Sequence, residues 1–155
     1  MKKLFLATMI TCGAIALLVA CSKKDDNAMP AGSALYQRLG SNAGIAKVID
    51  GFIGNVVGDT VINKFFARTA QSQERVDRLK MNLVNQVAQA VGGPEKYTGL
   101  SMKAAHVGMG INNKQFDALV GDMVASLKSN GVSDADIATI GGALTPMRAD
   151  IVEKP

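Results

Sequence analysis

The sequence predicts an all-α fold, and three observations indicate it. Apolar residues recur at intervals of three and four along several stretches, the period that lines one face of a helix. Glycine, proline and asparagine stand where these stretches end, as they do where helices stop. Runs with the strict alternation of a strand are nearly absent. The roughly 120 residues after residue 33 suffice for one domain with a hydrophobic core and are too few for two.

The first two long helices are expected within residues 45–91. The apolar positions of the first are Ile45, Val48, Ile49, Phe52, Ile53 and Val56. The short run "VINKFF" follows, and the polar "ARTAQSQERVD" is expected to cover a loop and the start of the second helix. The apolar positions of that helix are Leu79, Leu83, Val87, Ala90 and Val91. The "GGP" at 92–94 stops it.

A short helix is expected from about Ser101, and two longer ones follow. The stripe of the first is the clearest in the chain, made of Phe116, Leu119, Val120, Met123, Val124 and Leu127. Asn130 with Gly131 closes it in the manner of a left-handed cap. Ser133 with Asp136 resembles a capping box, opening a last helix that carries Ile137, Ile140, Leu144 and Ile151. Pro146 is expected to kink this last helix.

The first 20 residues have the layout of a secretory signal, because two lysines precede an apolar run that ends in small side chains. The next residue is Cys21, and "LVAC" at 18–21 resembles a bacterial lipobox, whose cysteine becomes the lipid-modified first residue of the mature protein. We therefore expect a lipoprotein signal peptide over 1–20, a lipidated flexible tether over 21–33 and a folded domain over 34–155. An ordinary cleavable signal is the alternative.

The residues around the cleavage site bear on localisation and partners. By resemblance to Gram-negative lipoproteins, Ser22 after the cysteine implies an exported protein, anchored at Cys21 in the outer membrane and facing the periplasm. Cleavage also removes Lys2, Lys3 and Cys12, which lowers the formal net charge from +4 to about +2. Nucleic acid is not implied as a partner. The mature domain would have no free thiol for a disulfide or a zinc site.

His106 is the only histidine in the chain, and it lies on an apolar run that is expected to be helical. By residue chemistry alone, such a histidine is more often hydrogen-bonded or half-exposed than a ligand. A zinc site needs three or four ligands, so a single histidine without thiols provides too few. No Gly-x-Ser-x-Gly nucleophile elbow accompanies it. Haem needs only one imidazole, so the sequence permits haem more readily than any other metal cofactor.

Five motifs follow one another over residues 35–152: "LYQRLG", "INKFF", "RLK" with "GGPEKYTG", "MKAAHVGMGI" and "MRADIV". Together they resemble the group I truncated globins, short relatives of haemoglobin that fold as a two-over-two helical sandwich. The resemblance implies haem b (iron protoporphyrin IX) as the cofactor. It also implies reversible binding of a diatomic gas, O2, CO or NO, at an iron held by a proximal histidine.

The resemblance assigns roles to single residues. His106 matches the proximal histidine, and its Nδ1 is expected to donate a hydrogen bond to the carbonyl of Met102, four residues earlier. Phe66 matches the aromatic residue that packs on the haem, with an ordinary core phenylalanine as the alternative. Leu79 and Leu83 fall on the distal helix over the iron.

The distal side departs from the family's pattern. Ile53 stands where many members carry a tyrosine whose hydroxyl donates to the bound gas, and Leu83 stands where a glutamine often sits. An unusually apolar distal pocket is therefore expected, with Gln86 as its only obvious polar candidate, unless that side chain points to solvent. Asn82 replaces a basic residue expected to hold a haem propionate. The residues that could take over this role are Arg78, Lys80, Tyr97 and Lys103.

Three functions are weighed on this basis. The leading one is reversible gas binding. The second is a haem enzyme, a nitric oxide dioxygenase or a peroxidase-like enzyme, which would need an electron-donor protein because the sequence contains no flavin or nicotinamide domain. The third is a haem-free lipoprotein with a structural or interaction role, against which the retention of His106 speaks.

Overall fold

The computed structural model describes residues 33–154, which form seven α-helices and three short 3-10 helices. The predicted all-α class is confirmed, since the described residues contain no strand and only one isolated bridge, between Asn112 and Lys154. Within the same residues, no helix combines the length and the apolar character that crossing a membrane requires.

The chain enters the domain through a tight pair of helices, α1 (Ala34–Arg38) and α2 (Ser41–Gly58). The hydroxyl of Ser33 caps α1 by accepting a hydrogen bond from the Tyr36 N–H at 3.2 Å. Gly40 joins the two helices in the left-handed region, at φ 81°. A Cβ on Gly44 would lie 1.9 Å from the carbonyl oxygen of Leu39, so the turn also requires glycine there.

Two 3-10 helices, Asn63–Phe65 and Thr69–Gln71, lead into α3 (Gln73–Ala90). This helix ends as expected at the "GGP" motif, with Gly92 at φ 81°. The following segment, 91–101, contains no helix. It leads to the five-residue helix α4 (Met102–His106), where the Ser101 hydroxyl accepts from the Ala104 N–H at 3.2 Å.

The last third of the chain forms α5 (Asn113–Ser129), α6 (Asp134–Leu144) and α7 (Arg148–Ile151). A reciprocal capping box starts α5, because Asn112 and Gln115 bond each other's backbone N–H at 2.9 and 3.0 Å. Pro146 has a stronger effect than the expected kink. It lies in the 3-10 helix Thr145–Met147, which separates α6 from α7.

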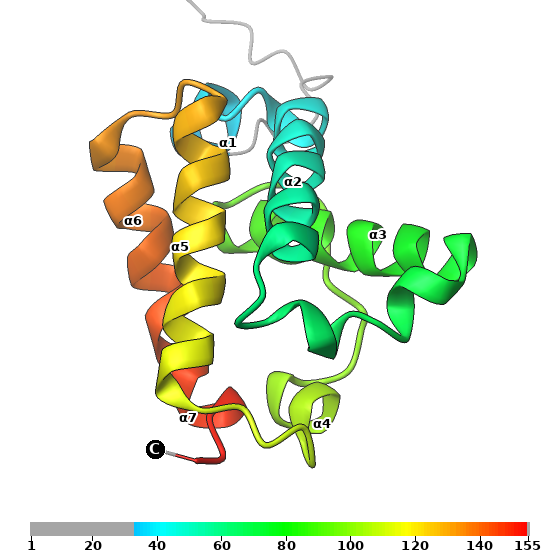
Figure 1. The fold of residues 1–155 in the computed structure, drawn as a ribbon. Helices are drawn as coiled ribbons and strands as arrows, with labels where there is room; N and C mark the ends of the chain where they lie inside the picture. Colours follow the sequence, from blue (N-terminus) through cyan, green and yellow to red (C-terminus); the bar gives the residue numbers. More distant parts are fainter. Residues whose placement is uncertain (1–32, 155) are drawn as a thin grey trace, which may run out of the picture.

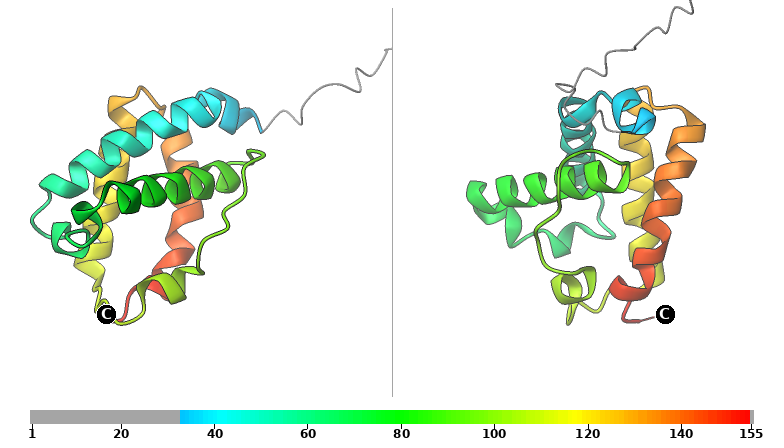
Figure 2. Two further views of the ribbon diagram at one scale, coloured as in Figure 1. Left: turned by 90° about the vertical axis from the view of Figure 1, so that its right-hand side faces the viewer. Right: turned by 180° about the vertical axis from the view of Figure 1, so that it is seen from behind.

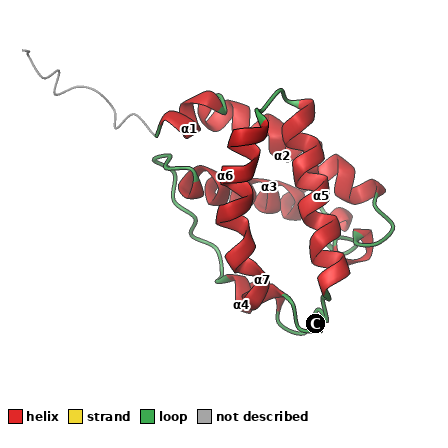
Figure 3. Ribbon diagram, turned by 90° about the vertical axis from the view of Figure 1, so that its left-hand side faces the viewer, coloured by secondary structure: helices red, strands yellow, loops and turns green. Residues whose placement is uncertain are grey.

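The four long helices form the predicted two-over-two sandwich. Helix α2 packs against both α3 and α5, and α5 packs against α6. Figures 1 and 2 show α2 and α3 as one layer that crosses the α5 and α6 layer, and Figure 3 shows α5 and α6 in front of the other two. Helices α4 and α7 lie together at one end of the molecule, opposite α1 (Figure 1).

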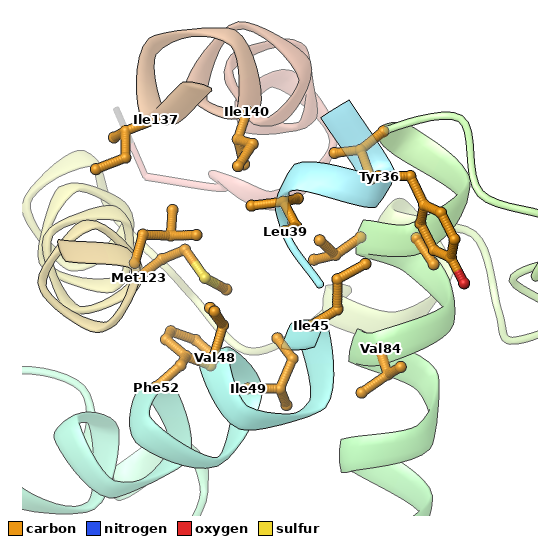
Figure 4. Packing of buried hydrophobic residues seen from close by; sticks show 14 of the residues in the cluster. Tyr36, Leu39, Ile45, Val48, Ile49, Phe52, Val84, Met123, Ile137 and Ile140 are labelled. Atoms are coloured by element: carbon orange, nitrogen blue, oxygen red, sulfur yellow. The ribbon is translucent and has the colours of Figure 1, made fainter. Parts of the chain in front are cut away.

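Apolar side chains are buried in two groups. The first, which we call the main core, joins α1, α2, α3, α5 and α6 (Figure 4). It includes Ile45 and Ile49, which are 1% and 0% exposed, and each such side chain contributes about 1.5–3 kcal/mol on burial. The second, which we call the end cluster, lies near α4 and α7. Its buried members are Ile111, Phe116 and Ile151.

Candidate functional site

An apolar cavity of about 340 Å³ opens between the helical layers and α4. Its walls come from helices α2 to α7 and from the segments that connect them. Within the part of the chain that the structure describes, no aspartate, glutamate, lysine or arginine lines this cavity. A mostly apolar ligand therefore suits the cavity better than an ionic one.

His106 lies at the C-terminal end of α4, is half-buried and lines the cavity. Its Nδ1 lies 2.7 Å from the carbonyl oxygen of Met102, the contact expected from the sequence. A carbonyl can only accept a hydrogen bond, so Nδ1 carries the hydrogen. In the neutral ring, Nε2 is then the atom with a free lone pair, which is the form in which an imidazole binds a metal.

Six of the other side chains expected at the site also line the cavity. They are Phe66, Leu79, Leu83, Gln86, Tyr97 and Met102. Phe66 comes from the segment between α2 and α3, the next three come from α3, and the last two lie in or just before α4. Residues that are up to 40 positions apart in the sequence are thus brought together around His106.

Ile53 is the exception, because it does not line this cavity. It lines a smaller apolar pocket of about 40 Å³, which shares the walls formed by Phe66 and Leu79 with the larger one. Phe52, the preceding residue, lines both. Consecutive residues on a helix point about 100° apart, so two neighbours cannot both face the centre of the cavity.

The amide of Gln86 reaches across the cavity. Its Nε2 lies 3.2 Å from the sulfur of Met102 and 3.5 Å from the sulfur of Met147. The side chain therefore connects α3 with α4 and with the 3-10 helix before α7. Thioether sulfur is a weak acceptor, so this amide retains most of its capacity to donate to a stronger one.

Tyr97 holds the end of the 91–101 segment. Its hydroxyl donates to the Leu100 carbonyl at 2.7 Å, and its backbone N–H donates to Oε1 of Gln89 at 2.9 Å. The hydroxyl proton is thus used within the segment, while the ring faces the cavity.

The other three residues considered for the propionates do not line the cavity. Arg78 pairs with Glu74 at 2.6 Å, and Lys80 pairs with Asp50 at 2.6 Å. Lys103 is exposed on α4 and has no ion pair among the described residues. Because its charge is not already neutralised, Lys103 is the most available of the three.

Two polar side chains at the cavity were missed from the sequence, Thr69 and Gln115. Gln115 lies four residues before Leu119, on the stripe that lines the cavity side of α5, so helical spacing alone could have indicated it. Thr69 lies in a 3-10 helix between α2 and α3, where no periodic pattern indicates which side chains face inward.

The donor set fits a cofactor that takes one imidazole. Among the described residues, no three His, Cys, Asp or Glu side chains are grouped so that they could hold a bare metal ion. A haem needs only the Nε2 of His106 together with apolar walls for its faces. The cavity offers both.

A two-over-two helical sandwich with one histidine on an apolar cavity defines a globin of the truncated class. Solved structures share this arrangement. The truncated haemoglobin of Tetrahymena pyriformis in its Fe(III) form is 28% identical, with a TM-score of 0.69 over 77% of this chain and 98% of that one. The 2/2 haemoglobin of Synechococcus sp. PCC 7002, solved in the cyanomet state with covalently attached haem, is 27% identical. Its TM-score is 0.70 over 80% of this chain and 100% of that one.

Sequence comparison gives the family. The profile of the bacterial-like globins matches residues 34–153. The group 1 truncated haemoglobin GlbN of Mycolicibacterium paratuberculosis is 32% identical over 119 residues, which cover 77% of this chain and 84% of that protein. The corresponding protein of Synechocystis is also 32% identical, over 72% of this chain and 91% of its own length. The chain belongs to the bacterial-like globins, among the group 1 truncated haemoglobins.

Proposed function

We propose that this protein binds haem b through His106 and reversibly binds a diatomic gas on it. The observation that carries the proposal is the hydrogen bond from Nδ1 of His106 to the Met102 carbonyl, because in the neutral ring it selects the tautomer whose Nε2 lone pair is free to bind a metal beside an apolar cavity. When bound, haem supplies an iron with one coordination position left for the gas. The relatives of this protein are named as haemoglobins, which supports the same function.

On the proximal side, the chain's task is to hold one imidazole in a fixed orientation. The Met102 carbonyl fixes the tautomer and the plane of the ring, and it also makes Nε2 a stronger donor to the metal. Met102 presents apolar surface to the cofactor on this side, while Phe66, in the segment between α2 and α3, presents it next to the distal helix. Loss of such supporting contacts typically weakens metal binding by about 10-fold to 100-fold.

On the distal side, Leu79 and Leu83 give the gas an apolar surrounding. Bound oxygen carries partial negative charge, and a hydrogen bond to a charged acceptor contributes about 1.5–3 kcal/mol. Without a tyrosine hydroxyl, oxygen should leave about 10-fold to 100-fold faster than from a tyrosine-bearing relative. CO and NO depend less on a donor, so the pocket favours these gases in relative terms.

The test is an absorption titration of the chain from residue 22 onward, which leaves out the lipidated Cys21, with haemin, followed by reduction and addition of CO. We expect a one-to-one Soret band that sharpens on reduction and shifts with CO. His106→Ala should lose or change this band while its far-ultraviolet circular dichroism stays helical, and added free imidazole should restore it in part. A folded wild-type chain that takes up no stoichiometric haem would contradict the proposal.

We also propose that the mature protein is a lipoprotein anchored through Cys21 in the outer membrane, facing the periplasm. Cys21 lies outside the described residues, and the support is the lipobox-like "LVAC". The described chain begins at Ser33, whose N–H donates to the Gly92 carbonyl at 3.0 Å. This start lies at the end of the molecule away from α4, so a tether there would leave the cavity unobstructed (Figure 1).

Cell fractionation and the mass of the mature N-terminus test the anchor. The wild-type chain should carry acyl groups and sediment with outer membranes, whereas Cys21→Ser should do neither. A wild-type N-terminus that is cleaved but carries no lipid would instead establish the ordinary cleavable signal.

A further inference from the structure

The loop that directly follows His106 has an unusual backbone. Gly108 and Gly110 both adopt the left-handed region, at φ 82° and 65°, a conformation that side chains with a Cβ rarely take. The His106 carbonyl accepts from the Met109 N–H at 3.1 Å, which ties the start of the loop to the end of α4. The N–H groups of the two glycines point out of the loop and need acceptors from elsewhere.

Both acceptors come from one side chain at the far end of the sequence. Oε1 of Glu153 accepts from the Gly108 N–H at 2.6 Å, and Oε2 accepts from the Gly110 N–H at 2.6 Å. The Ile111 carbonyl completes the connection by accepting from the N–H groups of Glu153 and Lys154, at 2.9 and 3.1 Å. We call this set of four hydrogen bonds the C-terminal clamp.

The clamp combines charge-assisted bonds with a buried anchor. Hydrogen bonds from N–H groups to a carboxylate are charge-assisted and roughly twice as strong as neutral ones. The two glycine N–H groups, followed by the charge of Lys154, lower the pKa of Glu153, so its carboxylate is ionised at neutral pH. Two residues before Glu153, Ile151 is buried in the end cluster, which anchors the segment to the domain.

Helix α4 needs such external support. A helix of five residues is far too short to be stable alone, and its last residue is His106. The Ser101 cap fixes its first turn, so the orientation of the last turn depends on what holds the loop beyond it. The clamp is attached two and four residues after His106.

We propose that Glu153 is a positioning residue for the proximal imidazole: its carboxylate holds the Gly108–Gly110 loop and thereby sets how Nε2 of His106 meets the iron. The inference rests on the proposed function, since it assumes that His106 is the ligand. Glu153 itself does not line the cavity and touches neither haem nor gas.

Two variants, Glu153→Ala and Glu153→Gln, test this role. Amide hydrogen exchange tests the clamp itself, and the iron–histidine stretching band tests its effect on the imidazole. In the haem-free chain, amide hydrogen exchange at Gly108 and Gly110 should become about tenfold or more faster in Glu153→Ala, because both acceptors are lost. Glu153→Gln keeps one acceptor oxygen and should fall between that variant and the wild type. Glu74→Ala is the matched control, since it removes an exposed glutamate from α3 and should change neither amide.

In the haem-loaded, reduced chain, the iron–histidine stretching band should shift or broaden in Glu153→Ala, and transfer of haem to a scavenging apoprotein should become about tenfold faster. Both changes should be smaller in Glu153→Gln than in Glu153→Ala. An unshifted band and wild-type haem transfer in Glu153→Ala would overturn the inference and leave the function intact. A wild-type chain that binds no haem would overturn the function first and this role with it.

Discussion

The main core and the end cluster stabilise different parts of the molecule. The main core joins five helices and fixes how the two layers cross (Figure 4). Of the residues that the structure describes, only Ile111, Phe116 and Ile151 are buried in the end cluster, and they come from a loop, α5 and α7. We infer that the crossing of the long helices depends mainly on the first group and the placement of the helix that carries His106 mainly on the second.

Polar contacts compensate for the small size of the end cluster. Arg148 lies 4.4 Å from the centroid of the Phe116 ring, donates to Oδ1 of Asn113 at 2.9 Å and forms an ion pair with Asp117. The C-terminal clamp lies on the same side of the domain. The region around α4 is therefore held largely by directional bonds, which can be altered one at a time without emptying a core.

The largest effect on stability is expected from Ile49→Ala in the main core. Ile49 is fully buried, so its truncation removes apolar contacts and leaves a cavity that the crossed helices cannot close. We expect the unfolding free energy of the haem-free chain to fall by about 3 kcal/mol, measured by urea denaturation. A loss below about 1 kcal/mol would mean that the main core does not dominate stability.

A smaller loss of stability, but a larger effect on the site, is expected from Ile151→Ala. This side chain is 6% exposed and lies at the edge of the domain, where neighbours can collapse onto the space. We expect a loss of about 1–2 kcal/mol in unfolding free energy. Because Ile151 also lines the cavity, haem transfer should be faster in this variant than in Ile49→Ala. The reverse order of haem transfer rates would contradict the division between the two groups.

Leu83→Gln should slow oxygen release by restoring a donor on the cavity wall. A side-chain hydrogen bond contributes about 1 kcal/mol, which corresponds to a roughly fivefold slower release by stopped-flow measurement. CO release should change little. Leu83→Met is the control, because it keeps the volume and adds no donor. Equal oxygen release in the two variants would show that position 83 does not reach the gas.

The smallest effect is a pH dependence at the edge of the main core, where the half-buried Glu95 contacts Tyr36. Glu95 accepts from the Tyr36 hydroxyl at 2.7 Å and from the Asn42 amide at 2.9 Å. Burial alone would raise the pKa of Glu95, but these hydrogen bonds outweigh it and place the pKa below its usual 4.5. The stabilisation is thus present above the unfolded-state pKa and is lost as pH falls through the lower folded value.

Glu95→Gln should remove this part of the acid sensitivity. The measurement is urea unfolding of the haem-free wild type and of the haem-free Glu95→Gln variant between about pH 6 and pH 3. We expect the difference in stability between wild type and variant to shrink towards the acid end. A difference that stays constant with pH would show that the Glu95 carboxylate does not contribute through its charge.

The helices were predictable because their signals are local. The "GGP" motif stops α3, Gly131 follows α5 at φ 75°, and the Ser133 side chain accepts from the Asp136 N–H at the start of α6. Pro146 indicated an irregularity in the last helix, and its consequence for the following helix was underestimated.

The site was predictable where a contact joins residues on the same helical turn, as for the bond from His106 to the Met102 carbonyl. It was less predictable where the tilt of a helix decides which of two neighbours faces inward, as for Phe52 and Ile53. The contacts of Glu153 with Gly108 and Gly110 span more than 40 residues of sequence, and no local pattern indicates them. Such contacts emerge only from the folded chain.

From the separation of the two buried groups we expect an order of assembly. The main core contains no residue of α4, so its helices can associate as soon as the chain is free to fold, before any cofactor is present. We expect the end around α4, which has the smaller buried group, to become ordered last. Folding of the main core and loading of the cofactor would then be two separate stages of maturation.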